Sequence, residues 1–237
     1  CGKTTLMRMV NAMVTPTSGR VFVRDQDVAG EDPVRLRRSI GYVLQEGGLF
    51  PHRSIADNIA TIPRLEGATK QASRERALEL LELVGLDLEM ADRYPAQLSG
   101  GQRQRVGVAR ALANRADILL MDEPFGALDP IVRAELQCEL KEIQRALGTT
   151  ILFVTHDVDE AFTLGDQVAI LSTGGHIEQV GTPTELLSSP ASPFVAEFVG
   201  ASRAARPVRV AGPDGLVVDD AGTPVGTLAR DEAGDRP

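Results

Sequence analysis

With 237 residues, of which 43% are hydrophobic and 24% are charged, the chain can form one α/β domain with a large core and an appendage. A net charge of −8 at pH 7 argues against a basic nucleic-acid groove, and no apolar run approaches the roughly 18 residues of a membrane-spanning helix. Its cysteines, Cys1 and Cys138, suggest no disulfide framework, which favours a reducing cytosol.

Short apolar runs alternate with longer amphipathic stretches along the chain, an order typical of an α/β fold with a mostly parallel sheet and crossover helices. ILLM and ILFV are apolar throughout, as expected for parallel strands that are covered on both faces. The predicted strands are residues 20–24, 40–44, 118–121, 150–155 and 167–171.

Amphipathic helices are predicted between these strands. Residues 73–84 place Ala77, Leu80, Leu81 and Val84 on one helix face. A later helix begins at the N-cap Asp129 with Pro130 after it, ends at Gly148, and carries Val132, Leu136, Leu140, Ile143 and Leu147 on one side. Residues 46–100 show helical signals and no convincing strand, which predicts a helical insertion.

The C-terminal residues 201–237 are rich in glycine and proline and have little apolar periodicity. Two apolar runs, GLVV and VGTL, flank DDAGTP, which has the composition of a hairpin turn. We therefore expect a flexible tail with one hairpin rather than an independent domain.

Polar residues follow two of the buried strands. In open α/β sheets ligands bind beyond the carboxyl ends of the strands. There Asp122 is placed to hold Mg²⁺, and Glu123 to orient or deprotonate a water that attacks a phosphate. His156 follows the next strand, where it is either structural or a donor to a terminal phosphate. A strand that simply exits into solvent would also explain the carboxylates.

The segment LSGGQRQRVGVARAL, residues 98–112, is the most informative one. Ser99 and Gln102 have the spacing of a capping box, so a purely structural interpretation exists. Capping does not require Gly100 and Gly101, which let a ligand approach the backbone at the positive end of a helix dipole. A second anion site is therefore implied. Since Lys3, in the N-terminal segment GKTT that reads as the end of a phosphate-binding loop, indicates one phosphate site, the second site is expected to act on a nucleotide held by another subunit.

The chain opens with Gly2, Lys3, Thr4 and Thr5, which read as the end of a phosphate-binding loop. Gln45 follows a predicted strand, where its amide can ligate Mg²⁺ or a water. The motifs occur along the chain in the order GKTT, Gln45, LSGGQ, ILLMDEP, GALD and His156. This ordered set resembles that of the nucleotide-binding subunit of an ATP-binding cassette (ABC) transporter. The resemblance covers residues 1–200, and LSGGQ is highly specific to that superfamily.

This resemblance implies a P-loop NTPase fold, with a nucleotide-binding domain at 1–200, a helical subdomain at 46–110 and a tail at 201–237. The family's P-loop begins before residue 1, so its first glycine, the preceding strand and an adenine-stacking aromatic residue are expected upstream. Two subunits would sandwich two ATP molecules head to tail. The resemblance implies a role for each matching residue. Nucleotide binding is implied for the P-loop residues Gly2, Lys3, Thr4 and Thr5, for the signature residues Ser99, Gly100, Gly101 and Gln102, and for Asp129 of the D-loop. Mg²⁺ binding is implied for Thr4, Asp122 and Gln45 of the Q-loop, and catalysis for Glu123, His156 and Gln45.

Three stretches, residues 40–65, 139–166 and 179–200, resemble importers of quaternary amines such as glycine betaine, choline and carnitine. That likeness implies an ATP-hydrolysing subunit, peripheral on the cytoplasmic face of the plasma (inner) membrane, with no nucleic-acid partner. Its partners would be a second copy, permease subunits that contact residues 49–51, and a separate substrate-binding protein. GLVVDDAGTPVGTL, residues 215–228, resembles one hairpin of the cystathionine-β-synthase-type regulatory modules of fuller family members.

Three alternatives remain open at this point. One is the same ATPase in an importer of sulfate, polyamine or sugar. Another is a soluble ABC ATPase that acts on DNA or ribosomes, although such proteins usually carry two cassettes or a long coiled coil. The third is a non-hydrolysing subunit, which the presence of Lys3, Glu123 and His156 disfavours.

Overall fold

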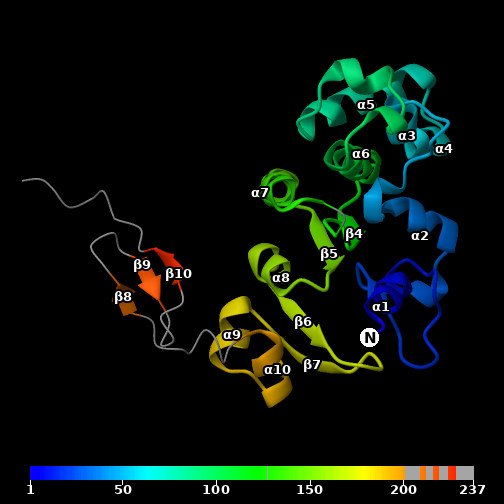
Figure 1. Cartoon of the computed structure of the whole chain (residues 1–237). Coiled ribbons are helices and arrows are strands. Elements are labelled where there is room, and N and C mark those ends of the chain that lie inside the picture. The colour runs from blue at the N-terminus through cyan, green and yellow to red at the C-terminus, as the bar shows by residue number, and fades with distance from the viewer. Residues whose placement is uncertain (127, 201–208, 212–215, 219–223, 228–237) are drawn as a thin grey trace, which may run out of the picture. The chain divides into compact units, whose positions relative to one another are not determined.

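The computed structural model describes residues 1–126, 128–200, 209–211, 216–218 and 224–227 (Figure 1). The chain divides into two compact units, one of Cys1–Leu164 with Leu171–His176 and one of Gly165–Ile170 with Ile177–Pro237. The division of the sequence into 1–200, with a helical subdomain at 46–110, and 201–237 stays a prediction.

A three-stranded parallel sheet forms the centre of the first unit. Its strand order is β3 (Ile40–Val43), β4 (Ile118–Asp122) and β5 (Thr150–Val154), so three of the predicted strands are confirmed. Asp122 pairs in register with Val154. Because parallel strands end at the same edge of a sheet, the residues that follow β4 and β5 lie close together.

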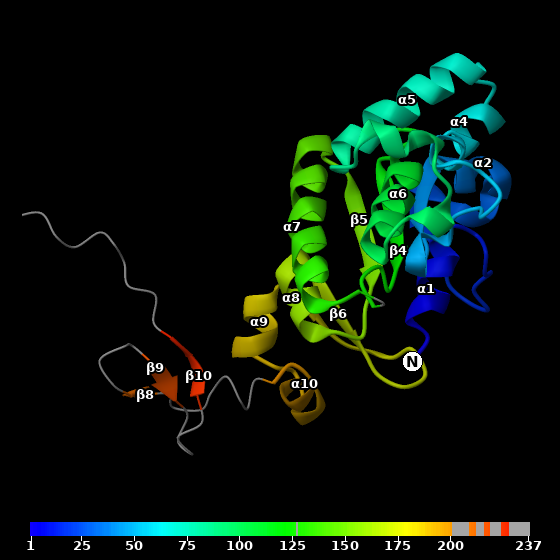
Figure 2. The same cartoon turned by 45° about the horizontal axis from the view of Figure 1, so that its top comes forward.

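Side chains of β4 alternate between two hydrophobic clusters on opposite faces of the sheet. Leu119 and Met121 pack in a cluster with α6 (Gly100–Leu112) and α7 (Pro130–Leu147). Leu120 packs in the other cluster, with α1 (Lys3–Val10) and α2 (Pro33–Ser39). Full burial of each such side chain contributes about 1.5–3 kcal/mol. Figure 2 shows α7 alongside β5 and β4.

Residues 46–112 contain helices and no strand among the described residues, as the sequence pattern indicates. The helix predicted at 73–84 is α5 (Lys70–Leu83), which begins three residues earlier because the Thr69 hydroxyl accepts the Ala72 N–H and caps it. The other elements are η2 (Gln45–Gly48), α3 (Ile55–Ile59), α4 (Thr61–Leu65), η3 (Leu88–Asp92) and η4 (Pro95–Gln97).

The caps predicted for the long helix α7 are confirmed. The Asp129 carboxylate accepts the Val132 N–H at 3.1 Å, and Gly148 ends the helix at φ 63° in the left-handed region. On its apolar side Leu136, Leu140 and Ile143 are buried, whereas Leu147 in the last turn is 46% exposed.

The run at 20–24 forms a strand only at β1 (Phe22–Val23), which pairs antiparallel with β2 (Gln26–Asp27). Arg24 and Asp25 have positive φ angles of 51° and 61°, and they turn the chain between these short strands. Two further elements of the first unit are η1 (Val28–Gly30) and α8 (Val158–Leu164).

In the second unit, β6 (Val168–Leu171) confirms the predicted strand at 167–171 and pairs with β7 (Ile177–Gly181). The helices α9 (Pro183–Ser188) and α10 (Pro193–Phe198) follow. The predicted hairpin pairs as β9 (Leu216–Val218) and β10 (Pro224–Thr227), antiparallel, and its turn lies outside the described residues. β8 (Arg209–Ala211) joins β9, which the sequence pattern did not indicate. The likeness of this hairpin to a cystathionine-β-synthase-type module stays a prediction.

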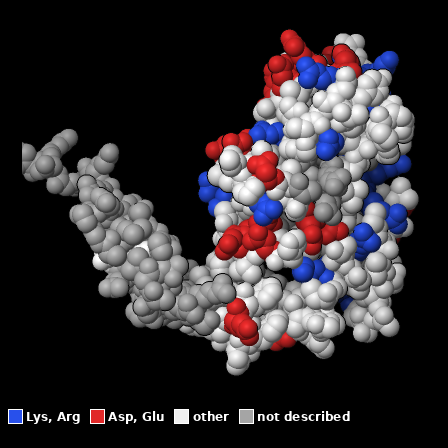
Figure 3. Space-filling model, in the orientation of Figure 1, with Lys and Arg blue, Asp and Glu red and all other residues white. Residues whose placement is uncertain are grey.

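Two further observations concern the length of the helices and the charge on the surface. No helix in the parts of the chain that the structure describes is long and apolar enough to cross a membrane. Acidic and basic side chains are interspersed over most of the first unit's face that Figure 3 shows.

Candidate functional site at the carboxyl edge of the sheet

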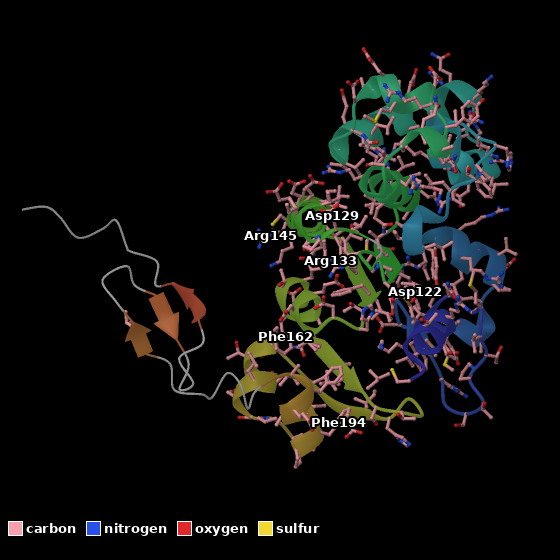
Figure 4. All side chains as sticks on the ribbon, viewed as in Figure 1. Asp122, Asp129, Arg133, Arg145, Phe162 and Phe194 are labelled. Carbon is pink, nitrogen blue, oxygen red and sulfur yellow. The ribbon has the colours of Figure 1, made fainter. Side chains whose placement is uncertain are left out.

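The carboxyl end of β4 meets the N-terminus of α1. The Thr4 hydroxyl donates a hydrogen bond to the Asp122 carboxylate, with 2.8 Å between Oγ1 and Oδ1. Both side chains are half-buried, and Figure 4 marks Asp122 at the end of its strand. Thr4 and Asp122 are 118 residues apart in the sequence, yet their side chains are in direct contact. This contact is what we expect of a pair that binds one metal ion.

Glu123 points elsewhere than its neighbour, because its backbone is left-handed. Its φ is 45°, and its N–H donates to the Val154 carbonyl of β5 at 2.9 Å. This turn brings Glu123 Oε1 within 3.2 Å of His156 Nδ1. A non-glycine residue in this region costs about 1–3 kcal/mol, and such strain is concentrated at functional sites. The two adjacent carboxylates therefore serve different partners.

An open polar cleft lies beside these residues. Its lining consists of Thr4, Arg8, Leu44, Gly48, Asp122 and Glu123. The N-terminus of α1 borders it, where Gly2 (φ 94°) precedes the helix without a side-chain cap. Free backbone N–H groups and the positive end of the helix dipole suit this place to a phosphate. Lys3 Nζ lies 3.4 Å from Cys1 Sγ, and Thr5 is exposed.

Arg8 is a residue of the cleft that the sequence reasoning missed. It stands four positions after Thr4 on α1, and residues at this spacing share one helix face. The helical spacing from the GKTT segment was therefore a signal that could have found it. Its guanidinium adds positive charge to a cleft that otherwise contains two carboxylates.

The loop after β3 brings Gln45 to the same edge of the sheet. η2 starts at Gln45, and its neighbours Leu44 and Gly48 line the cleft, although the Gln45 side chain lies outside the described part of the structure. Arg110 of α6 holds this loop, donating to the Gly47 and Gly48 carbonyls at 2.8 Å each. Burial lowers the pKa of Arg110. Sequence analysis gave no signal for this attachment.

The segment LSGGQ caps α6 as predicted. The Gln102 N–H donates to Ser99 Oγ at 3.2 Å, and the Ser99 N–H donates to Gln102 Oε1 at 2.9 Å. Packing also explains why position 101 is a glycine, since a Cβ on this buried residue would lie 2.8 Å from Val132 Cγ1 of α7. At Gly100 a Cβ would meet only ordinary contacts, the nearest at 3.5 Å.

The predicted site residues therefore fall into two groups. Thr4, Asp122 and Glu123 line one cleft, with His156 in contact with Glu123. Ser99–Gln102 and Asp129 stand at the N-termini of α6 and α7 and are not among the residues that line this cleft. Within the described part of the chain, the signature segment (residues 98–102) thus lies apart from the lining of this cleft.

Thr4 and Asp122 fit a magnesium ion chemically, since both offer hard oxygen atoms toward the cleft. No group of three or more His, Cys, Asp or Glu side chains suited to a metal ion occurs among the described residues. Magnesium in phosphate-transfer sites uses few protein ligands besides phosphate and water, so a closed protein cage is not required.

Known proteins that are similar to this chain identify its family. The family model described as ABC transporter matches residues 1–126. The glycine betaine/carnitine/choline transport ATP-binding protein OpuCA of Bacillus subtilis (strain 168) is 55% identical over 203 residues, 86% of this chain and 53% of that protein. The carnitine transport ATP-binding protein OpuCA of Listeria monocytogenes is 54% identical over 203 residues, 86% and 51% of the respective chains. The chain thus spans about half the length of these relatives.

Among solved structures, the ATP-binding cassette MJ0796, in a dimeric post-hydrolysis state bound to ADP and Pi, is 33% identical with a TM-score of 0.67. The match covers 76% of this chain and 80% of that one. The predicted P-loop NTPase fold and the resemblance to quaternary amine importer subunits are therefore confirmed. The chain belongs to the ABC transporter family.

Proposed function

We propose that this chain is the ATP-hydrolysing subunit of an importer for quaternary amine osmoprotectants, such as glycine betaine, choline or carnitine. The observation that carries the hydrolytic part is the meeting of Thr4 with Asp122, and of Glu123 with His156, at one edge of the sheet. The names of the relatives at 54% and 55% identity support the substrate class.

In this mechanism the phosphates of ATP bind at the N-terminus of α1, to its backbone N–H groups and the Lys3 ammonium. Thr4 and Asp122 would hold Mg²⁺, which neutralises charge on the β- and γ-phosphate oxygens when bound. Glu123 orients the attacking water and accepts its proton. His156 turns Nδ1 to Glu123, so Nε2 is the ring nitrogen left to contact the γ-phosphate.

Hydrolysis in this proposal needs two copies of the chain. The signature segment lies outside the cleft of its own chain, and its helix N-terminus suits a phosphate held by a second copy. Asp129, exposed at the start of α7, would lie in the same interface. Leu49, Phe50 and Pro51 would receive the permease subunits, with the protein peripheral on the cytoplasmic face of the membrane. A separate binding protein would deliver the substrate.

A complementation experiment tests the two-copy site. Neither Ser99→Arg nor Lys3→Ala protein alone should hydrolyse ATP at the wild-type rate, because each removes one half of every composite site. A mixture of the two restores one intact site per heterodimer, so partial phosphate release should return. No recovery in a mixture that light scattering shows to be dimeric would refute the head-to-tail arrangement. No Mg²⁺-dependent ATP hydrolysis by the wild-type dimer would refute the enzymatic function itself.

Substrate class is tested separately. The subunit is reconstituted in lipid vesicles with its permease and binding protein, and ATP turnover is measured with each candidate substrate. Glycine betaine, choline or carnitine should stimulate turnover, whereas sulfate, spermidine and a neutral sugar should not. Stimulation by sulfate, spermidine or the sugar alone would assign the subunit to one of the alternative importers.

A further inference from the structure

Arg133 of α7 joins the turn before its own helix to the segment that carries His156 (Figure 4). Its Nη1 donates to Asp157 Oδ2 at 3.2 Å, and its Nη2 donates to the Leu128 carbonyl at 3.3 Å. Leu128 immediately precedes the α7 N-cap, Asp129, and Asp157 immediately follows His156. One guanidinium therefore joins the turn at 128–129 to the segment 155–157, which we call the switch loop.

The third partner of Arg133 is a buried carboxylate. Glu160 of α8 is only 4% exposed, and its Oε1 lies 3.7 Å from Arg133 Nε. Its other oxygen, Oε2, accepts a hydrogen bond of 2.6 Å from the Thr155 hydroxyl. A carboxyl group this deeply buried needs hydrogen-bond or charged partners, and Thr155 and Arg133 provide them. The rigid planar fork of arginine holds such partners in a fixed geometry, whereas the three donors of a lysine ammonium rotate on a flexible stem.

The same network fixes both residues that flank His156. Asp157 Oδ1 accepts the N–H groups of Asp159 and Glu160 at 2.9 and 3.2 Å and so caps α8, while its Oδ2 takes Arg133. The Thr155 hydroxyl accepts the Asp157 N–H at 3.0 Å and donates to Glu160. His156 therefore extends toward Glu123 from a loop whose side chains on either side are held.

We propose that Arg133 is a positioning residue that links the turn at 128–129 to the switch loop and thereby sets the position of His156 relative to Glu123. The inference rests on the proposed function, in which Asp129 lies against a second copy. Closure of the dimer at Asp129 is then transmitted through Leu128 and Arg133 to the residue that contacts the γ-phosphate. Arg133 is not among the residues that line the cleft, so it would act through His156.

A purely structural role for Arg133 is the competing explanation, since it balances the charge of Glu160. The double variant Arg133→Gln/Glu160→Gln separates the two roles, because it removes the unbalanced buried charge together with the link. Arg145→Gln is the matched control, with the same change on an exposed residue of the same helix (Figure 4).

Each variant is purified at full chain length and assayed for kcat, KM for ATP, and melting temperature. Arg133→Gln and the double variant should both lose about tenfold in kcat, with KM within about twofold of wild type, as expected for loss of a transition-state interaction. The double variant should regain the melting temperature that Arg133→Gln loses. Arg145→Gln should leave all three quantities unchanged.

An assay without turnover checks the same point. The chain has three histidines, so the imidazole ¹⁵N resonances can be assigned by single substitution. The His156 signals should shift or broaden in the double variant, and those of His52 and His176 should not. Wild-type kcat or unshifted His156 signals in the double variant would overturn the inference while leaving the proposed function intact. An inactive wild-type dimer would overturn both.

Discussion

Replacing Glu123 by glycine and by glutamine separates the backbone strain at this residue from its chemistry. The φ of 45° is left-handed, which costs an L-residue about 1–2 kcal/mol relative to glycine. Glycine loses about 0.5–1 kcal/mol more conformational entropy on folding. The net expectation for Glu123→Gly is a gain of about 0.5–1 kcal/mol, which for a chain of this size raises the melting temperature by about 2 °C.

Glu123→Gln keeps the β-carbon, and with it the strained backbone and the N–H bond to Val154. Its melting temperature should stay within about 1 °C of wild type, because neither folded-state strain nor unfolded-state entropy changes. An amide cannot accept the proton of the attacking water, so turnover should fall at least about tenfold, a barrier increase of about 1.4 kcal/mol. Glu123→Gly should lose turnover to at least the same extent.

Differential scanning calorimetry and steady-state phosphate release measure the two effects on the same samples. Asp25→Gly is the control, because Asp25 is exposed and also has a positive φ, 61°, but lies on the β1–β2 turn. Aspartate tolerates this region better than glutamate, so Asp25→Gly should gain less stability and keep full turnover. A Glu123→Gly protein that melts below Glu123→Gln would refute the strain argument. Near-wild-type turnover of Glu123→Gln would remove Glu123 from the role of base.

Three further changes test the supporting structure. Gly101→Ala should cost about 1–3 kcal/mol in urea unfolding, because its Cβ would lie 2.8 Å from Val132, and Val132→Ala in the same chain should recover most of that loss. Asp129→Ala removes the α7 N-cap and should cost about 1 kcal/mol in the same assay. The hydrogen bond from Arg24 lowers the pKa of Asp117 below 3.8, so this pair contributes stability above that pH and loses it as the pH falls through the lower folded value. Melting temperatures of wild type and Asp117→Asn should therefore differ most near neutral pH and converge in acid.

β3 and β4 could be predicted from the sequence because their side chains are buried on both faces of the sheet, whereas β5 is equally apolar but leaves Leu152 43% exposed. β4 sends Leu119 and Met121 into one hydrophobic cluster and Leu120 into the other, so every position must be apolar. The caps of α6 and α7 could also be predicted from the sequence, since capping depends on residues within one turn of each other. Helix caps and strands buried on both faces can therefore be predicted from short stretches of sequence.

The short strand pair of β1 and β2 could not be predicted in this way. The run at 20–24 looked like one strand, but Arg24 and Asp25 turn the chain back at positive φ. Side-chain contacts between segments that are remote in the sequence could not be predicted either. Arg8 joins the cleft by its place on α1, and Arg133 meets Asp157 only because α7 packs near the end of β5. Charged residues on amphipathic helices resemble ordinary surface positions until the tertiary structure supplies their partners.

The two glycines of the signature segment show how the structure changes a functional interpretation. Both were assigned to the approach of a ligand, on the argument that capping by Ser99 needs neither of them. Gly101 is buried, and a side chain there would collide with Val132, so packing of α6 on α7 is enough to require glycine. Gly100 is half-buried with ordinary space for a Cβ near Leu128, so packing in the described part of the chain does not require a glycine there. The ligand argument is therefore needed for Gly100 alone, at the first position of the helix, where its N–H is free for an anion.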